Sequence, residues 1–134
     1  MTYGEPIHLS DAKKIVAAAQ AEAAKNGWNM AIAIVDSGAN LVLLEKMDNT
    51  QLGSIEICQA KALTAIKFKR ATKAFEETVE KGGVNLKILG MPNVIPVEGG
   101  EIIIKNNKII NTIDVSNALS AQDTQVAKAG IAAL

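Results

Sequence analysis

The sequence predicts an α/β fold in one domain, residues 1–134: a profilin-like α/β/α sandwich with a mainly antiparallel sheet. The first reason is the order of the elements, which runs helix, two strands, one or two helices, two strands and a final helix. Tight turns join consecutive strands, so sequential neighbours are antiparallel. The strands are apolar on both faces over most of their length, which indicates that helices cover both sides of the sheet.

A helix followed by a hairpin is predicted in the first third of the chain. Ser10 is a suitable N-cap, small and aliphatic residues follow it at helical spacing, and Gly27 ends the helix. The segments MAIAIVD (30–36) and LVLLEKMD (41–48) flank SGAN, which favours a hairpin turn.

The next predicted helix, residues 53–70, carries apolar residues on two sides. Ser54 is its expected N-cap, and Ile57 and Phe68 lie outside its main apolar stripe. Such a helix has two neighbours, here the sheet and either a second helix or another subunit. Thr72 is then expected to cap a short helix that ends near residue 81. The segment 84–100, which contains several Gly and Pro residues, is expected to be mostly irregular.

The last part of the chain is predicted to be a hairpin and a helix. Two isoleucine-rich strands within 101–115 surround Asn106 and Asn107, which tolerate the left-handed backbone of a tight turn. Ser120 is expected to begin the final helix, with Asp123 in its first turn. The inner side of this helix is small, so a neighbouring backbone can approach it closely; the residues are Ala127, Ala129, Gly130, Ala132 and Ala133.

The composition argues against several classes of partner. Fourteen basic and fourteen acidic side chains leave no net charge, so no long-range field attracts nucleic acid or an anionic membrane. We find no apolar run long enough to span a bilayer and no secretory signal at the N-terminus. Cys58 is the single cysteine, so a disulfide within the chain is excluded and a reduced, cytoplasmic location is expected.

The sequence contains no strong catalytic or metal-binding motif. One histidine and one cysteine cannot supply a zinc ligand set, and there is no Walker loop. His8 is the only imidazole, which makes it the candidate nitrogen ligand for haem iron or cobalt; the alternative is an exposed residue just before a helix. Cys58 is expected to be packed rather than reactive. Three methionines are expected to fill the core rather than to ligate a soft metal: Met30, Met47 and Met91.

Two further sets of charged side chains are candidates for a site. Lys61 interrupts an apolar helix face, where it either binds a carboxylate or propionate or snorkels past the face to solvent. Glu45, Lys46 and Asp48 lie at a strand end close in sequence to Ser54, and a carboxylate with an ammonium can transfer a proton. Ordinary surface charge at a strand end is the alternative for this second set.

The chain carries, in this order, the segments IAIVDSGANLVLLEKMD, GSIEICQAKALTA, IPVEGGEIII and QDTQVAKAGIAAL. They resemble the GlcG/HbpS-like family, once called the haem-degrading domain family, and the resemblance extends from about Leu9 to Leu134. The same domain forms the C-terminal part of some corrinoid adenosyltransferases. The resemblance implies a profilin-like fold and a homo-oligomer, a dimer or larger. It also implies haem or a cobalamin-type tetrapyrrole as the ligand of some members, and a link to glycolate or diol catabolism.

The chain departs from that family where glycines are usual. The family ending, roughly G-x-I-G-V-S-G-G followed by Q-D, is matched at Val115, Ser116, Gln122 and Asp123. Other residues replace glycines at Asn111, Asp114, Asn117 and Ala118. We therefore expect a narrowed loop over 111–118 in which Asp114 repels an anionic ligand, and a well-capped connection rather than an anion cradle.

Three functions are compatible with the sequence. The first is a small-molecule-binding accessory protein of a diol or glycolate pathway, with haem or a corrinoid as the leading ligand. Its candidate cofactor-binding residues are His8, Lys61 and Ser116, and His8 is a metal ligand only if haem is bound. The second is a small lyase or isomerase acting on an organic acid, with Lys46, Lys61 and Asp36 near the site. The third is a ligand-free oligomeric assembly protein. An enzyme is the less favoured function, because no acid–base constellation is evident.

Overall fold

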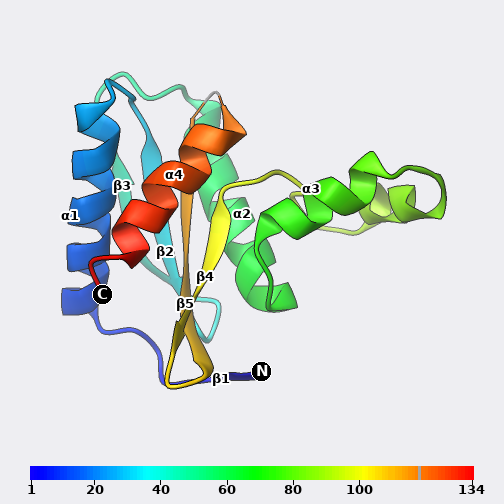
Figure 1. The fold of residues 1–134 in the computed structure, drawn as a ribbon, viewed down its shortest axis with the longest axis horizontal. Helices are drawn as coiled ribbons and strands as arrows, with labels where there is room; N and C mark the ends of the chain where they lie inside the picture. The colour runs from blue at the N-terminus through cyan, green and yellow to red at the C-terminus, as the bar shows by residue number, and fades with distance from the viewer. Residues whose placement is uncertain (118) are drawn as a thin grey trace.

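The structure, a computed structural model that describes residues 1–117 and 119–134, is a sheet covered by helices on both faces (Figure 1). Its elements in chain order are β1 (Thr2–Tyr3), α1 (Leu9–Lys25), β2 (Ala31–Asp36), β3 (Leu41–Lys46), α2 (Gly53–Phe68), α3 (Thr72–Glu80), the 3₁₀ helix η1 (Gly83–Gly90), β4 (Gly100–Lys105), β5 (Lys108–Ser116) and α4 (Ser120–Ile131). The predicted α/β/α sandwich is therefore confirmed.

The sheet is built around β5. This strand pairs with β4 along one edge and with β2 along the other, and β3 lies outside β2. These pairings are all antiparallel, whereas β1 pairs in parallel with the start of β5 at Lys108 and Ile109. The sheet is thus mixed, and mainly antiparallel as predicted. The sequence does not predict β1, because two residues carry no detectable periodicity.

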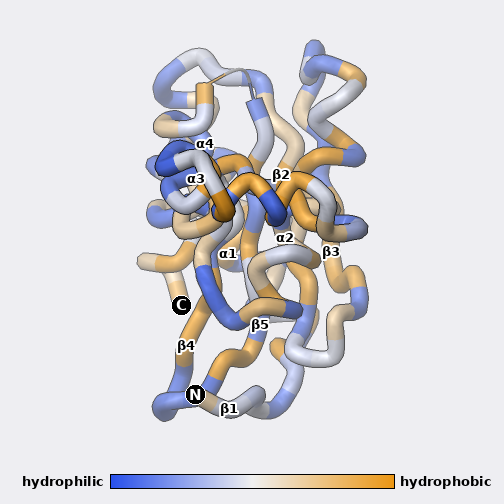
Figure 2. Tube along the Cα trace, turned by 90° about the vertical axis from the view of Figure 1, so that its right-hand side faces the viewer, coloured by the Kyte–Doolittle hydropathy of each residue, from blue (hydrophilic) through white to orange (hydrophobic). Residues whose placement is uncertain are grey.

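Helices α1 and α4 cover one face of the sheet and α2 covers the other (Figure 1). The larger core cluster joins Ile15 of α1 and Val126 of α4 to Ile113 of β5. On the opposite face, Ala62 and Cys58 of α2 pack against β2. Figure 2 shows the consequence along the chain, since β2 is hydrophobic over most of its length. Alternate side chains of one strand enter different layers, so residues adjacent in β5 have different surroundings.

Helix α3 and η1 form an arm that projects from the sandwich (Figure 1). The arm has a small core of its own, in which the Phe75 ring meets the Phe68 ring edge-on with 5.4 Å between centroids. Phe68 therefore gives α2 a second neighbour, as predicted, whereas Ile57 is 37% exposed. The expectation that 84–100 is mostly irregular is wrong over η1. A 3₁₀ helix has a period of three residues, which the search for helical spacing does not detect.

Turns follow the predictions more closely than helix starts do. Asn106 and Asn107 have positive φ angles of 50° and 59°, as the tight turn between β4 and β5 requires. The predicted N-caps are wrong by one or two residues, and the observed N-cap positions carry no side-chain cap hydrogen bond: His8, Leu52, Ala71 and Leu119.

The four polar residues predicted as caps lie within their helices instead: Ser10, Ser54, Thr72 and Ser120. Ser54 is buried, and Thr72 Oγ1 accepts a hydrogen bond from Gly100 N at 2.9 Å, so tertiary contacts rather than helix ends use these two side chains. Among the described residues, no helix combines the length and the hydrophobicity that crossing a bilayer requires.

Candidate functional site

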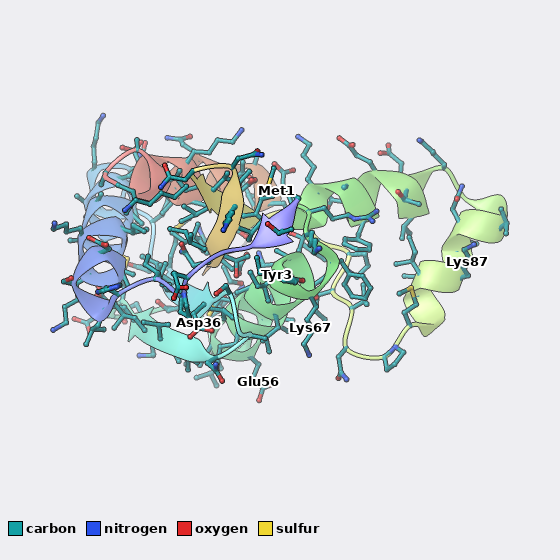
Figure 3. The ribbon with its side chains drawn as sticks, turned by 90° about the horizontal axis from the view of Figure 1, so that it is seen from below. Met1, Tyr3, Asp36, Glu56, Lys67 and Lys87 are labelled. Atoms are coloured by element: carbon teal, nitrogen blue, oxygen red, sulfur yellow. The ribbon has the colours of Figure 1, made fainter. Side chains whose placement is uncertain are left out.

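A pocket of about 450 Å³ lies between the segment before α1 and the tip of the β4–β5 hairpin. The pairing of β1 with β5 holds this segment in place, and Gly4 N donates to Ile109 O at 2.8 Å. The close approach requires a glycine, because a Cβ on Gly4 would lie 2.9 Å from Lys108 Cβ. Tyr3 anchors the start of the segment by donating from its hydroxyl to Ile66 O of α2 at 2.8 Å, and Figure 3 shows Tyr3 beside this helix.

The pocket wall combines an imidazole, two ammonium groups, two carboxylates and apolar surface. His8 at the start of α1 supplies the imidazole, and Lys105 and Lys108 of the hairpin supply exposed ammonium groups. The carboxylates of Glu5 and Asp11 belong to the α1 side, so the hairpin is the cationic side. The other lining residues are Tyr3, Gly4, Pro6, Ile7, Asn106 and Ile110.

These lining groups match the chemistry of a metal-centred ring that carries carboxylates. An imidazole nitrogen can ligate iron or cobalt, ammonium groups can pair with carboxylates, and Ile7 and Ile110 offer apolar contact to the ring. The volume also falls in the range of about 300–1,000 Å³ that is usual for small-molecule sites. The pocket therefore has the volume of a small-molecule site and carries groups that can bind a metal or an anion.

Lys61, a second candidate binding residue, lies in the interior near the opposite end of β5 and is 0% exposed. Its Nζ donates to Val115 O at 2.9 Å, to Glu98 O at 3.1 Å and to Asp123 Oδ2 at 3.2 Å. The alternative that Lys61 snorkels to solvent is wrong, because the ammonium is satisfied within the fold. These contacts use its three N–H donors, so none is directed at an external propionate.

Asp114 faces Lys61 from β5 and is also fully buried, with its Oδ1 3.4 Å from Lys61 Nζ. The predicted loop over 111–118 is wrong as far as Ser116, because the run of β-branched residues here continues β5. Asp114 is therefore not positioned to repel a ligand at the surface. Asn117 follows the strand, and Ala118 lies outside the described residues.

Burial dominates the ionisation of both aspartates beside Lys61. It raises the pKa of Asp114 well above its ordinary value, an effect that the Lys61 ammonium opposes and the Asp123 carboxylate reinforces. Burial also raises the pKa of Asp123 to about 6, again against the effect of Lys61. In both aspartates, burial therefore favours the neutral carboxyl group and the nearby Lys61 side chain favours the carboxylate.

Glycine and threonine residues enclose this group, which we call the Lys61 cluster (Lys61, Glu98, Asp114 and Asp123). A Cβ on Gly99 would collide with Lys61 Nζ and lie 3.0 Å from Val115 O, and Gly99 has a φ of +134°. Thr124 Oγ1 donates to Glu98 Oε1 at 2.7 Å. The cluster is therefore a closed interior arrangement, separate from the pocket at the hairpin end.

The remaining predicted binding residues lie outside the pocket. Ser116 is buried at the end of β5, where it pairs with Ala31 of β2. Cys58 is buried on α2, and burial raises the pKa of its thiol to about 12, which suits a packed thiol. Met30 is fully buried in the core, and the other two methionines named above are partly buried.

The residues considered for a lyase or isomerase are not brought together. Asp36 ends β2, where its Oδ1 accepts hydrogen bonds from Gly38 N and Asn40 N, both at 2.9 Å. Lys46 pairs with Ala31 at the other end of β2. Lys61 is enclosed in the interior, so Asp36 stabilises a turn and the three side chains share no common surface.

Sequence reasoning misses Lys105 and Lys108 as site residues. A signal was available, because the two lysines flank the Asn-Asn turn and must emerge at the same end of a hairpin. The approach of the segment before α1 had no comparable signal, since it depends on a two-residue strand and on Gly4. The lining of the pocket becomes visible only once that strand is placed.

Comparison with known proteins gives consistent results. The family model described as haem degrading protein HbpS-like matches residues 7–132. Protein GlcG of Escherichia coli strain K12 is 40% identical over 105 residues, which cover 78% of this chain and 77% of that protein. The crystal structure of HbpS has a TM-score of 0.88 and 26% identity, and the match covers 100% of this chain and 94% of that one.

The structure of a PduOC:heme complex also has a TM-score of 0.88, at 24% identity, over 96% of this chain and 95% of that one, which shows a shared fold. The family model spans nearly all of the described chain, and the GlcG relative covers more than two thirds of it. On these matches, the chain belongs to the HbpS-like family.

Proposed function

We propose that this protein is an accessory protein of a glycolate- or diol-type catabolic pathway that binds a tetrapyrrole, with haem as the leading ligand. The observation that carries the proposal is the pocket that brings His8 together with Lys105 and Lys108. An imidazole next to two ammonium groups and apolar surface is a donor set that suits a metalloporphyrin with propionates.

Two comparisons support this ligand and setting. The family description names haem, and a protein with the same fold has been crystallised as a haem complex. The 40% identity to GlcG supports the pathway type that the sequence resemblance implies. The pocket is independent support, because its residues lie before α1 and in the hairpin and it does not use the altered glycine positions.

Each lining residue has a distinct role in the proposal. His8 would hold the metal through a neutral imidazole nitrogen, and Lys105 and Lys108 would pair with the propionates. Ile7 and Ile110 would contact the ring. When bound, haem supplies redox chemistry or ligand binding at its iron, while the protein residues bind and orient the group.

Titration of the purified protein with haemin, followed by visible absorption, tests the proposal. Wild-type protein should take up haemin and give the spectrum of an imidazole-ligated iron, and His8→Ala should change that spectrum and weaken binding. Lys105→Gln/Lys108→Gln should weaken binding by roughly 2- to 30-fold, because each exposed ion pair contributes about 0.2–1 kcal/mol.

The matched control is Lys81→Gln/Lys87→Gln, which removes the same charge from the arm. Figure 3 shows Lys87 at the end of the arm far from the sandwich, so this variant should bind haemin as the wild type does. No haemin uptake by the wild type, or an unchanged spectrum and affinity in His8→Ala, would overturn the proposal. A parallel titration with cobalamin distinguishes a corrinoid site, which would show cobalamin binding without haemin binding.

A further inference from the structure

The Lys61 cluster contains more buried acid than its single ammonium can balance. Lys61 and Asp114 have relative exposures of 0%, and Asp123 has 2%. In the part of the chain that the structure describes, Asp114 Oδ2 and Asp123 Oδ1 have no hydrogen-bond partner, and Asp114 Oδ1 has only its ion pair with Lys61 Nζ at 3.4 Å. Buried carboxyl oxygens without partners are rare and call for a physical explanation. The location of Asp114 supplies one.

Asp114 is an electrophile held next to an amine. Its Oδ1 lies 3.4 Å from Lys61 Nζ, and the carbonyl carbon is one bond further on. The atom attacked is Cγ, so a small movement of the two side chains must first bring Nζ to within about 3–3.5 Å of it, and groups held at that separation react with effective concentrations of about 10⁵ M or more. Burial raises the pKa of Asp114 and so favours its neutral form, and a neutral carboxylic acid accepts a nucleophile far more readily than a carboxylate.

The contacts of Lys61 provide a route to the neutral amine that the reaction needs. Two of its N–H groups point to the backbone carbonyls of Glu98 and Val115, and the third points to Asp123 Oδ2 at 3.2 Å. Transfer of that third proton to Asp123 leaves a lone pair on the nitrogen that faces Asp123, and rotation about the Cε–Nζ bond then turns this lone pair towards Asp114. Asp123 is within the distance expected of a general base.

We propose that Lys61 and Asp114 condense into an intramolecular isopeptide bond, with Asp123 as the group that moves the proton. The Nζ–Cγ bond forms, and the bond between Cγ and the hydroxyl oxygen of Asp114 breaks. Asp123 takes one proton from the ammonium and ends protonated, a second proton passes from the nitrogen to the departing hydroxyl, and one water molecule leaves. The amide keeps one N–H. No oxidant or cofactor is required.

The surroundings favour the amide over the separated groups. The reaction replaces a buried ammonium and a buried carboxyl group with one neutral amide. The amide has a smaller desolvation penalty in an apolar interior. The remaining N–H can still donate to the carbonyl of Val115 or Glu98. The α2 side of β5, with Ala62 and Cys58 close by, excludes the bulk water that would drive the reverse hydrolysis.

Intact mass spectrometry of the purified full chain under denaturing conditions tests the bond. The expected mass is that of the sequence less one water molecule, after correction for any loss of the first methionine, which a peptide map reports. Trypsin should fail to cleave after Lys61, and the peptide that contains Lys61 should be joined to the one that contains Asp114. The exposed pair Lys14 and Asp11, 3.8 Å apart, is the internal control and should remain unlinked.

Three variants test the role of each residue in forming the bond. Lys61→Arg and Asp114→Ala should each restore the full mass, and Asp123→Asn should slow the loss of water while both reacting groups remain. A wild-type mass equal to that of the complete sequence, with a free Lys61 peptide after prolonged incubation of the folded protein, would overturn the proposal. So would a link from Lys61 to any residue other than Asp114. The wild-type measurement decides the question even if a variant does not fold.

Discussion

Replacement of Gly99 by alanine should destabilise the protein strongly, because the added methyl group enters the Lys61 cluster. Gly99 has a φ of +134°, a conformation that alanine rarely adopts. The new Cβ would collide with Lys61 Nζ and lie 3.0 Å from Val115 O and 3.1 Å from Asp123 Cβ. The end of a lysine normally moves aside at little cost. Here Nζ is held by buried partners on several sides, and the carbonyl of Val115 belongs to the central strand.

Two terms give the size of the effect. Alanine in such a backbone conformation costs about 1–3 kcal/mol. Displacement of Nζ from one charge-assisted hydrogen bond adds about 1.5–3 kcal/mol. We therefore expect the free energy of unfolding to fall by roughly 3–6 kcal/mol. Gly82→Ala is the matched control, since Gly82 has a φ of +68° but a Cβ there would meet nothing within 4 Å. It should cost only the backbone term of about 1–3 kcal/mol, since a ψ of −162° places Gly82 in a region that is almost exclusive to glycine.

Urea unfolding followed by circular dichroism measures both variants, with the free energy taken from the midpoint and slope. The reasoning predicts that Gly99→Ala loses about 1.5–3 kcal/mol more than Gly82→Ala, which is the hydrogen-bond term alone. Equal losses in the two variants would show that only the backbone conformation matters and that the Lys61 cluster yields freely to an added methyl group.

Three other outcomes are expected. Gly130→Leu should lower the melting temperature, because even a Cβ atom on residue 130 would lie 3.0 Å from both Ile113 Cδ1 and Ile15 O. An unchanged melting curve would contradict this close packing. The pKa of Asp123 is raised from 3.8 to about 6, so its contribution to stability is present below pH 3.8 and is lost as the pH rises through about 6. Stability should therefore fall over this window, and a slope equally steep in Asp123→Asn would argue against Asp123 as the titrating group. Light scattering should report a homo-oligomer, since the chain exposes large hydrophobic residues such as Leu52 at 84%; a mass of 14.1 kDa would exclude it.

Most of the fold could be predicted from local sequence patterns. The hairpin around Asn106 and Asn107 follows from residues that lie next to one another, and so do the strands on either side of it. Helix starts were predicted less well, because a polar residue near a helix start can cap it or can point into the fold. Thr72 shows the difference, since its partner is Gly100, 28 residues further along the chain.

The Lys61 cluster could not be predicted from the sequence, because its members also lie far apart along the chain. A lysine among apolar helix residues suggests either a binding role or snorkelling, and the choice depends on whether a partner reaches it in the interior. The partner carboxylate of Asp123 lies 62 residues away, on a helix of the opposite layer. Asp114 gave a misleading signal, because its place in a segment usually rich in glycine suggested a loop, whereas the neighbouring β-branched residues continue the strand.

The two proposed chemistries occupy opposite ends of one strand, and this separation follows from how the sheet is covered. At its start β5 reaches the exposed hairpin tip, so Lys108 is accessible and the pocket is open to a ligand. Towards its end β5 lies between α2 and α4, so Asp114 is enclosed and meets only groups of the same chain. Open surface favours reversible binding, and a water-free interior favours a condensation that releases water. The haem proposal and the isopeptide proposal therefore depend on different residues, and failure of one leaves the other intact.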